Sequence, residues 1–257
     1  MHTTMGHLAH RRRVLGTVAT VLMVGMPSAR GQSPSAARRA PGHVVLLGDS
    51  VFDNAGYLRG SGPELLAQLR TRLPAGWQAT RLAKGGSVAS DVPGQLGRLP
   101  RDATHLVISA GGNDAGRREG ALGEPVRSVA EGLARIAAIR EGFARDYRTM
   151  LDAAPGRSLP IAVCTIYDPR FPEPGRRQVS IVALAAFNDV ITREAFVRGI
   201  SLLDLRLLCD REEDFAAPTG PSVQGGAKIA AEIARWATEH GAERGRSEVF
   251  TGRDGTN

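Results

Sequence analysis

The stretch HVVLLGDS, residues 43–50, decides the fold. Its aliphatic run has the length of one strand and no polar alternation, so it predicts a β-strand over His43–Leu47 that is buried on both faces. Strands of this kind are typical of parallel sheets covered by helices on both sides. Gly48 and Asp49 then predict a sharp turn out of the strand, which places the hydroxyl of Ser50 above the edge of the sheet.

The rest of the chain alternates between short apolar runs and longer helical patterns. Further buried strands are predicted over Trp77–Ala83, His105–Ser109, Ile161–Ile166 and Ile200–Leu203. Helices are predicted over Pro63–Leu73, Val92–Leu99, Pro125–Met150, Val179–Val197 and Pro221–Thr238. This alternation implies right-handed crossovers, so we expect a flavodoxin-like, three-layer α/β/α fold with about five parallel strands.

The N-terminal region has the pattern of a targeting signal. A basic cluster, Arg11–Arg13, precedes an apolar run of 13 residues over Val14–Met26 and then small and polar residues. Because the run is shorter than the ~20 residues that span a bilayer, it favours a cleaved signal peptide over residues 1–31, similar to the twin-arginine type, and no stable membrane span after processing. We therefore expect a periplasmic or secreted protein.

Composition sets the domain limits and excludes one class of partner. A chain of 257 residues, 42% of them hydrophobic, suits one domain of roughly 200 residues, which we place at 43–240 between a linker (32–42) and a polar tail (241–257). Six of the seven net positive charges lie in residues 1–42. The domain thus carries no charge pattern for binding nucleic acid. Cys164 and Cys209 fit either a disulfide or two separate buried thiols.

Chemistry is expected where the parallel strands end, because working loops gather at that edge. Ser50 follows the first strand and has the position of a nucleophile. Lys84-Gly85-Gly86-Ser87 follows the second strand, and its backbone can approach a ligand and offer an N–H group. Gly111-Gly112-Asn113-Asp114 follows the third strand and adds a side-chain amide donor. Each block alone fits a turn or a helix cap, and it is their order that points to a site.

These three blocks resemble those of the SGNH (GDSL) hydrolase family. The resemblance covers about Val44 to Thr238 and implies ester hydrolysis. It also implies that Ser50 is the nucleophile, and that the amides of Ser50 and Gly86 and the side chain of Asn113 form an oxyanion hole. No metal or other cofactor is expected, and the substrate would be a small-molecule or glycan ester.

The fourth block of the family is missing its base. Members usually carry Asp-x-x-His just before the last helix, but here Ala217 and Gly220 occupy those positions. His43 and His105 stand at the beginnings of their strands, roughly 15 Å or more from Ser50. Carboxylates on loops at the correct edge remain, namely Asp53, Asp114, Asp168 and Asp214. Asp214 is the candidate base because it retains an acidic group just ahead of the last helix.

Two functions are consistent with this pattern. The first is an exported serine esterase that cleaves small acyl esters, such as acetyl groups on a glycan. The second is a catalytically impaired binding or accessory protein that kept the pocket of the SGNH fold. The segment Pro169–Gln178 fits either a lid over the site or a stiff loop.

Overall fold

The computed structural model describes residues 41–155, 158–239 and 247–252. The predicted signal peptide and the linker up to residue 40 lie outside these residues. Within them, a parallel six-stranded sheet has the order β2-β1-β3-β4-β5-β8. The strands are β1 (His43–Gly48), β2 (Gln78–Arg81), β3 (His105–Ser109), β4 (Ile161–Cys164), β5 (Ser201–Leu203) and β8 (Val249–Phe250). Five of them match the predicted strands, whereas β8 comes from the region predicted as a polar tail.

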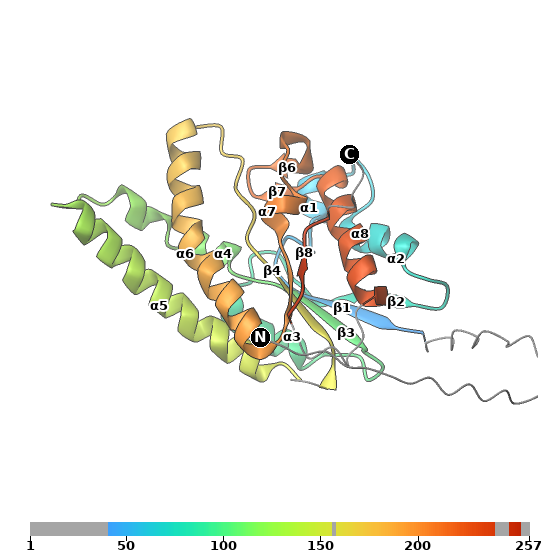
Figure 1. Ribbon diagram of the computed structural model, residues 1–257. Coiled ribbons are helices and arrows are strands. Elements are labelled where there is room, and N and C mark those ends of the chain that lie inside the picture. The colour runs from blue at the N-terminus through green and yellow to red at the C-terminus, as the bar shows by residue number, and fades with distance from the viewer. Residues whose placement is uncertain (1–40, 156–157, 240–246, 253–257) are drawn as a thin grey trace, which may run out of the picture. The chain divides into compact units, whose positions relative to one another are not determined.

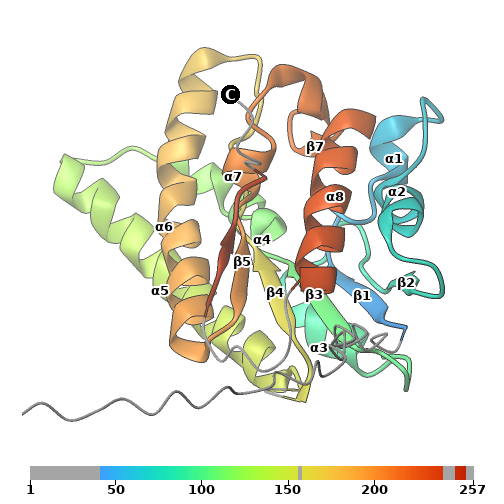
Figure 2. The same cartoon turned by 45° about the vertical axis from the view of Figure 1, so that its right-hand side comes forward.

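Helices cover both faces of the sheet, which confirms the predicted three layers. Figure 2 shows α2 (Leu65–Arg72) and α8 (Val223–Glu239) on one side and α5 (Val129–Ala153) and α6 (Pro174–Arg198) on the other. The β1 residues alternate between two cores: Val44 and Leu46 face α2 and α8, while Val45 and Leu47 face α5 and α6. Burial on both sides explains why this strand is aliphatic throughout.

The two long helices begin at different residues from those predicted. The α5 helix begins at Val129 and not at Pro125, because Ser128 caps it by accepting a hydrogen bond from the amide of Glu131. The α6 helix begins at Pro174, five residues before the predicted start, with proline in the first turn, where its missing N–H costs nothing. No helix in the described ranges is long and apolar enough to cross a bilayer.

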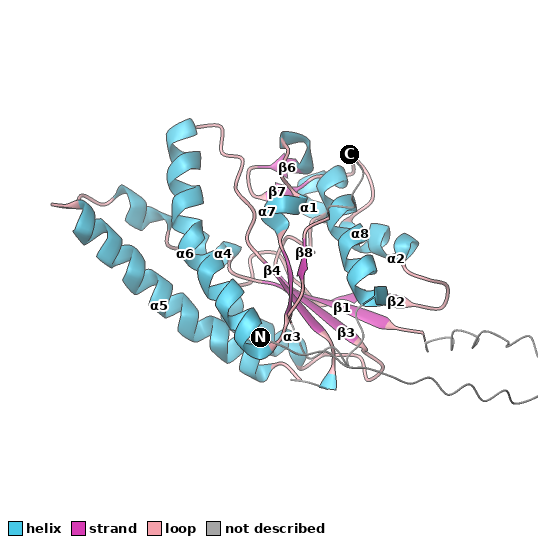
Figure 3. Cartoon of the chain, in the orientation of Figure 1, coloured by secondary structure: helices cyan, strands magenta, loops and turns pink. Residues whose placement is uncertain are grey.

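Short elements fill the carboxyl edge of the sheet (Figures 1 and 3). The short helices there are α1 (Ala55–Leu58), α4 (Gly112–Gly116) and α7 (Leu205–Leu208), whereas α3 (Val92–Leu96) packs on β1 and α5. The 3-10 turns are η1 (Ala89–Asp91), η2 (Glu119–Gly123) and η4 (Glu212–Asp214), and a small antiparallel pair joins β6 (Phe215–Ala217) to β7 (Gly220–Pro221).

The two cysteines do not form a disulfide. Cys164 and Cys209 are both free and buried in the core under α8. Burial raises the pKa of the Cys209 thiol to about 12, so it stays protonated at neutral pH. Of the two alternatives, separate buried thiols is the correct one.

The turn after β1 depends on a glycine. Gly48 has φ +114°, and a Cβ atom there would lie 1.7 Å from the carbonyl oxygen of Ser109 on β3. The amide of Asp49 donates to that same oxygen at 3.1 Å. Gln95 of α3 holds Gly48 from the other side, because its Oε1 accepts from the Gly48 amide (2.7 Å) and its Nε2 donates to the Gly48 carbonyl (2.9 Å). The chain therefore leaves the sheet in one fixed direction.

Replacing Gly48 should prevent this turn. We expect Gly48→Ala to lower the free energy of unfolding by more than about 4 kcal/mol, because the methyl group would overlap main-chain atoms of β3. Gly60→Ala is the matched control, since Gly60 also has positive φ but open space around its Cβ position, and it should cost roughly 1–2 kcal/mol. Urea denaturation of both variants measures the difference. Equal losses would contradict the role given to the contact with Ser109.

Candidate active site

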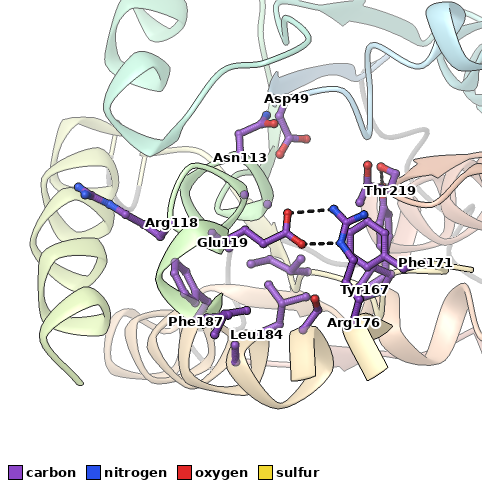
Figure 4. A pocket seen from close by; sticks show the side chains of 18 of the residues that line it. Asp49, Asn113, Arg118, Glu119, Tyr167, Phe171, Arg176, Leu184, Phe187 and Thr219 are labelled. Carbon is purple, nitrogen blue, oxygen red and sulfur yellow. Dashed lines mark hydrogen bonds and ion pairs between the residues drawn. The ribbon is translucent and has the colours of Figure 1, made fainter. Parts of the chain in front are cut away.

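A cavity of about 300 Å³ opens beside Ser50 at the carboxyl edge of the sheet (Figure 4). Most of its wall is apolar, and the lining residues come chiefly from α4, η2, α5, α6 and the loop that precedes α6. The apolar lining side chains include Val51, Leu122, Ile136, Ile139, Ile166, Phe171, Leu184 and Phe187. Asp49 and Asn113 lie at one end and Leu184 and Phe187 at the other (Figure 4). The cavity therefore joins a polar end to an apolar interior.

Ser50 lies in the wall of this cavity, at the position predicted for the nucleophile. Its Oγ accepts a hydrogen bond from the phenol of Tyr57 at 3.0 Å. Tyr57 comes from α1, the four-residue helix that follows the Ser50 turn, and it also lines the cavity. Sequence reasoning did not single out Tyr57, because a lone tyrosine in a short loop carries no pattern.

Two backbone amides near Ser50 have no acceptor among the described residues. They are the amide of Ser50 itself and the amide of Gly86. The neighbouring Gly85 amide instead donates to Oδ2 of Asp53 at 2.9 Å, which favours Gly86 over Gly85 as an oxyanion donor. Gly86 has φ +82° and lines a shallow hollow next to the cavity, together with Ser87.

Asn113 connects the third block to the second. Its Nδ2 donates to the carbonyl oxygen of Ser87 at 2.8 Å, which uses one of the two amide hydrogens. The other hydrogen stays available for a ligand in the cavity that Asn113 lines. The structure thus brings Ser50 and Asn113 to one wall and places Gly86 beside it, one residue from Ser87.

Asp49 is buried beneath the turn that carries Ser50. Its Oδ1 accepts hydrogen bonds from the amide of Val51 (3.0 Å) and from the hydroxyl of Ser109 (3.2 Å). Burial raises the pKa of Asp49 to about 7, against the lowering effect of these two hydrogen bonds. No sequence pattern predicts this raised pKa, because it depends on how deeply the turn is packed.

Gly220, which the sequence analysis aligns with the family's histidine, has no room for a side chain. It is buried in β7, and a Cβ atom there would lie 2.4–2.6 Å from ring atoms of Tyr57. The ring therefore fills the volume that any larger residue at position 220 would enter.

Asp214, the base suggested by the sequence, is bonded to other residues than Ser50. Its carboxylate is fully buried, pairs with Nζ of Lys228 at 2.7 Å and accepts a hydrogen bond from the amide of Arg211. These contacts hold η4 against α8. None of the four loop carboxylates proposed from the sequence is among the described residues that line the cavity. These four are Asp53, Asp114, Asp168 and Asp214.

The strand histidines are also engaged elsewhere. His43 begins β1, where its Nδ1 lies 3.0 Å from a carboxylate oxygen of Asp102 and its Nε2 lies 2.8 Å from the hydroxyl of Thr80. His105 begins β3 and its ring packs on Trp77 and Trp236. Both stand at the opposite ends of their strands from the Ser50 turn.

One ion pair crosses the outer part of the cavity. Arg176 of α6 donates two hydrogen bonds to the carboxylate of Glu119 in η2, at 2.7 and 3.0 Å (Figure 4). The same guanidinium lies 3.8 Å from the ring centroid of Phe171. Since α6 begins at Pro174, the segment Pro169–Gln178 is partly helical.

Known proteins with this arrangement identify the family. Residues 46–227 match the GDSL-like lipase/acylhydrolase family, which is well over half of the chain. The chain belongs to this family. The match includes the Ser50, Gly86 and Asn113 blocks, and it confirms the resemblance inferred from them. Among curated proteins, none matches this sequence.

Solved structures share the acylhydrolase fold at low sequence identity. An extracellular lipase from Streptomyces rimosus has a TM-score of 0.56 and 19% identity, covering 76% of this chain and 99% of its own. A lipase from a goat rumen metagenome has a TM-score of 0.59 and 16% identity, and the match covers 80% of this chain and 100% of the lipase. Est24, a carbohydrate acetylesterase from Sinorhizobium meliloti, has a TM-score of 0.52 and 13% identity, and the match covers 77% of this chain and 99% of Est24. These likenesses confirm the fold.

The buried carboxyl of this GDSL-family chain should make its stability depend on pH. An ordinary aspartate ionises near pH 4, whereas Asp49 in the folded chain ionises at about pH 7. Between these two values the folded chain therefore binds one proton more than the unfolded chain. The contribution of Asp49 to the free energy of unfolding therefore falls as the pH rises through this window, by up to about 4 kcal/mol, and is constant above it. Asp49→Asn keeps the acceptor oxygen and should remove this fall.

Urea denaturation at pH 5 and pH 8 checks the expectation. The matched control is Asp189→Asn, because the hydrogen bonds from Arg140 and Arg193 lower the pKa of Asp189, so that its titration falls below this range, and arginine does not titrate within it. It should keep the pH dependence of the wild type. If Asp49→Asn keeps it too, the assignment of a proton to Asp49 is wrong.

Proposed function

We propose that the protein is a serine esterase in which Ser50 attacks the ester carbonyl. One observation carries the proposal: the Ser50 hydroxyl lies in the wall of an apolar cavity, beside hydrogen-bond donors that have capacity to spare. An ester bound with its acyl group in the cavity would bring its carbonyl carbon to Ser50. The developing oxyanion would then accept from the amides of Ser50 and Gly86 and from Nδ2 of Asn113.

The reaction would proceed in two steps through an acyl-enzyme. Ser50 Oγ forms a bond to the carbonyl carbon and the alcohol leaves, so that the acyl group remains on Ser50. Water then attacks the same carbon and releases the carboxylic acid. The three donors stabilise the tetrahedral species of both steps, a contribution worth roughly 10²–10³ in rate for each donor in enzymes of this kind.

The shape and lining of the cavity support an apolar acyl chain of more than two carbons. An acetyl group would leave most of the roughly 300 Å³ and its aliphatic walls without contacts. A longer chain would bury apolar surface on Ile139, Leu184 and Phe187. We therefore extend the substrate from the small acyl esters expected from the sequence to esters of longer aliphatic acyl groups with a small-molecule or glycan alcohol.

We also propose that the esterase acts outside the cytoplasm. The support is the leader with its basic cluster, Arg11–Arg13, and its apolar run, Val14–Met26. The S. rimosus lipase of the same fold is described as extracellular.

A binding or accessory role is the second candidate. Glycine at position 220 favours it, because the family's general base is missing there. Such a protein would bind an acylated ligand in the same cavity and release it unchanged. Turnover that depends on Ser50 separates the two candidates.

Replacing the nucleophile should remove turnover. We expect Ser50→Ala to lower kcat on p-nitrophenyl butyrate by at least about 10³-fold and to abolish labelling by a fluorophosphonate probe, because both reactions need the serine oxygen. Ser90→Ala, an exposed serine on η1, is the matched control and should keep both. Equal hydrolysis by wild type and Ser50→Ala would exclude the esterase.

Acyl-chain length should set the rate. On p-nitrophenyl esters from acetate to octanoate, we expect kcat/KM to rise roughly fourfold for each added CH₂, because each buried CH₂ contributes about 0.8 kcal/mol. Ala183→Phe, which puts a ring into the cavity wall, should move the best substrate to a shorter chain. A rate that falls from acetate onward in the wild type would contradict the proposed acyl site.

A further inference from the structure

Tyr57 contacts the reacting atom of the proposed esterase. Its phenol oxygen lies 3.0 Å from Ser50 Oγ, and no other described side chain is hydrogen-bonded to that oxygen. Tyr57 also lines the cavity, so a bound ester would lie against it. A residue placed in this way can exchange a proton with the nucleophile.

The ring of Tyr57 packs on Gly220, the position that the resemblance assigns to the family's histidine. A side chain at position 220 would begin with a Cβ atom 2.4 Å from Cγ of Tyr57 and 2.5 Å from its Cδ1. These ring atoms are close to the main chain of α1, so the overlap cannot be relieved by moving the far end of a flexible side chain. The glycine at position 220 and the phenol at position 57 are therefore parts of one packing arrangement.

The main chain around Tyr57 fixes the position of the phenol. The amide of Tyr57 donates to the carbonyl oxygen of Asn54 at 3.0 Å. Asn54 is fully buried, and its Oδ1 accepts from the amide of Leu65 at the start of α2. The α1 helix is thereby attached to α2, and the hydroxyl is held over Ser50.

Other acid–base groups in the cavity wall have different partners. Glu119 is paired with Arg176, and the phenol of Tyr167 donates to the carbonyl oxygen of Thr219 at 2.5 Å. The Asp49 carboxylate accepts from the Val51 amide and the Ser109 hydroxyl. Tyr57 is thus the cavity residue whose ionisable side chain is bonded to Ser50.

We propose that Tyr57 is a catalytic residue that exchanges the proton of Ser50 in place of the missing histidine, an inference that rests on the proposed esterase activity. A phenol both donates and accepts, so it can pass a proton along without a change in its own net charge. The hydroxyl of Ser50 and that of Tyr57 can each rotate to reverse the direction of their hydrogen bond.

The proton balance closes in both steps. In acylation, the Ser50 proton moves to the phenol oxygen of Tyr57 while the phenol proton moves to the departing alkoxide, which leaves as the alcohol. In deacylation, a proton of the attacking water moves to Tyr57 while the phenol proton returns to Ser50 Oγ. The distance of 3.0 Å between the two hydroxyl oxygens allows proton transfer between them in either direction.

Tyr57→Phe tests the proposal, because it removes the phenol oxygen and keeps the ring packed on Gly220. We expect kcat on p-nitrophenyl butyrate to fall by roughly 10²-fold or more, with KM within about twofold of the wild type, since general acid–base catalysis contributes 10²–10⁴. Tyr147→Phe is the matched control. The Tyr147 phenol is buried in the core under α5 with no hydrogen-bond partner among the described residues, so its removal should leave kcat unchanged.

The outcomes separate this proposal from the esterase itself. Wild-type kcat in Tyr57→Phe, together with inactivity of Ser50→Ala, would overturn the role of Tyr57 and keep the esterase. A kcat above wild type in Tyr57→Phe would overturn it as well, since the phenol would then restrain the serine. Absence of any Ser50-dependent turnover in the wild type would overturn both.

Substitutions at positions 220 and 57 test whether the two side chains compete for the same space. Gly220→His should lower the midpoint of thermal unfolding by several degrees, because the new side chain overlaps the ring. Adding Tyr57→Ala should recover most of that loss by making room. If Gly220→His alone has wild-type stability, the two side chains do not compete for one place and the proposal fails.

Discussion

The contact between the Gly48 backbone and the Ser109 carbonyl oxygen fixes the rest of the site. Only a residue without a Cβ can approach β3 so closely with a φ of +114°. That approach directs Asp49 inward, where its carboxyl group binds the Ser109 hydroxyl, and leaves Ser50 facing the cavity. Gln95 completes the turn by pairing with both polar groups of Gly48. The turn that carries Ser50 is thereby attached to the sheet by hydrogen bonds of Gly48 and Asp49.

The cavity results from a mismatch in length between helices and strands. The α5 and α6 helices have 25 residues each, or about 37 Å, whereas β3 has five residues, or about 17 Å. Both helices therefore extend past the sheet edge, as Figure 1 shows. Their protruding turns have no strand to cover, and Ile136, Ile139 and Leu184 line the cavity instead. The walls of the site are thus a direct product of helix length.

The elements that show a hydrophobic pattern along the chain could be predicted from the sequence, whereas the features that depend on tertiary contacts could not. The strands were predictable because residues such as Val44–Leu47 are buried on both sides, and Ser50 because it follows one of them. The two-residue β8 was missed because Val249–Phe250 is too short to show a pattern. Tyr57 and the raised pKa of Asp49 could not be predicted, since each arises from atoms distant in the sequence.

The packing of the Tyr57 ring on Gly220 also constrains how this chain can change over evolutionary time. Neither position can be altered freely while its neighbour stays the same, because a bulky residue at 220 and an aromatic ring at 57 exclude each other. The two sites form an epistatic pair. A descendant with an imidazole at position 220 would need a second mutation that removes the ring at position 57.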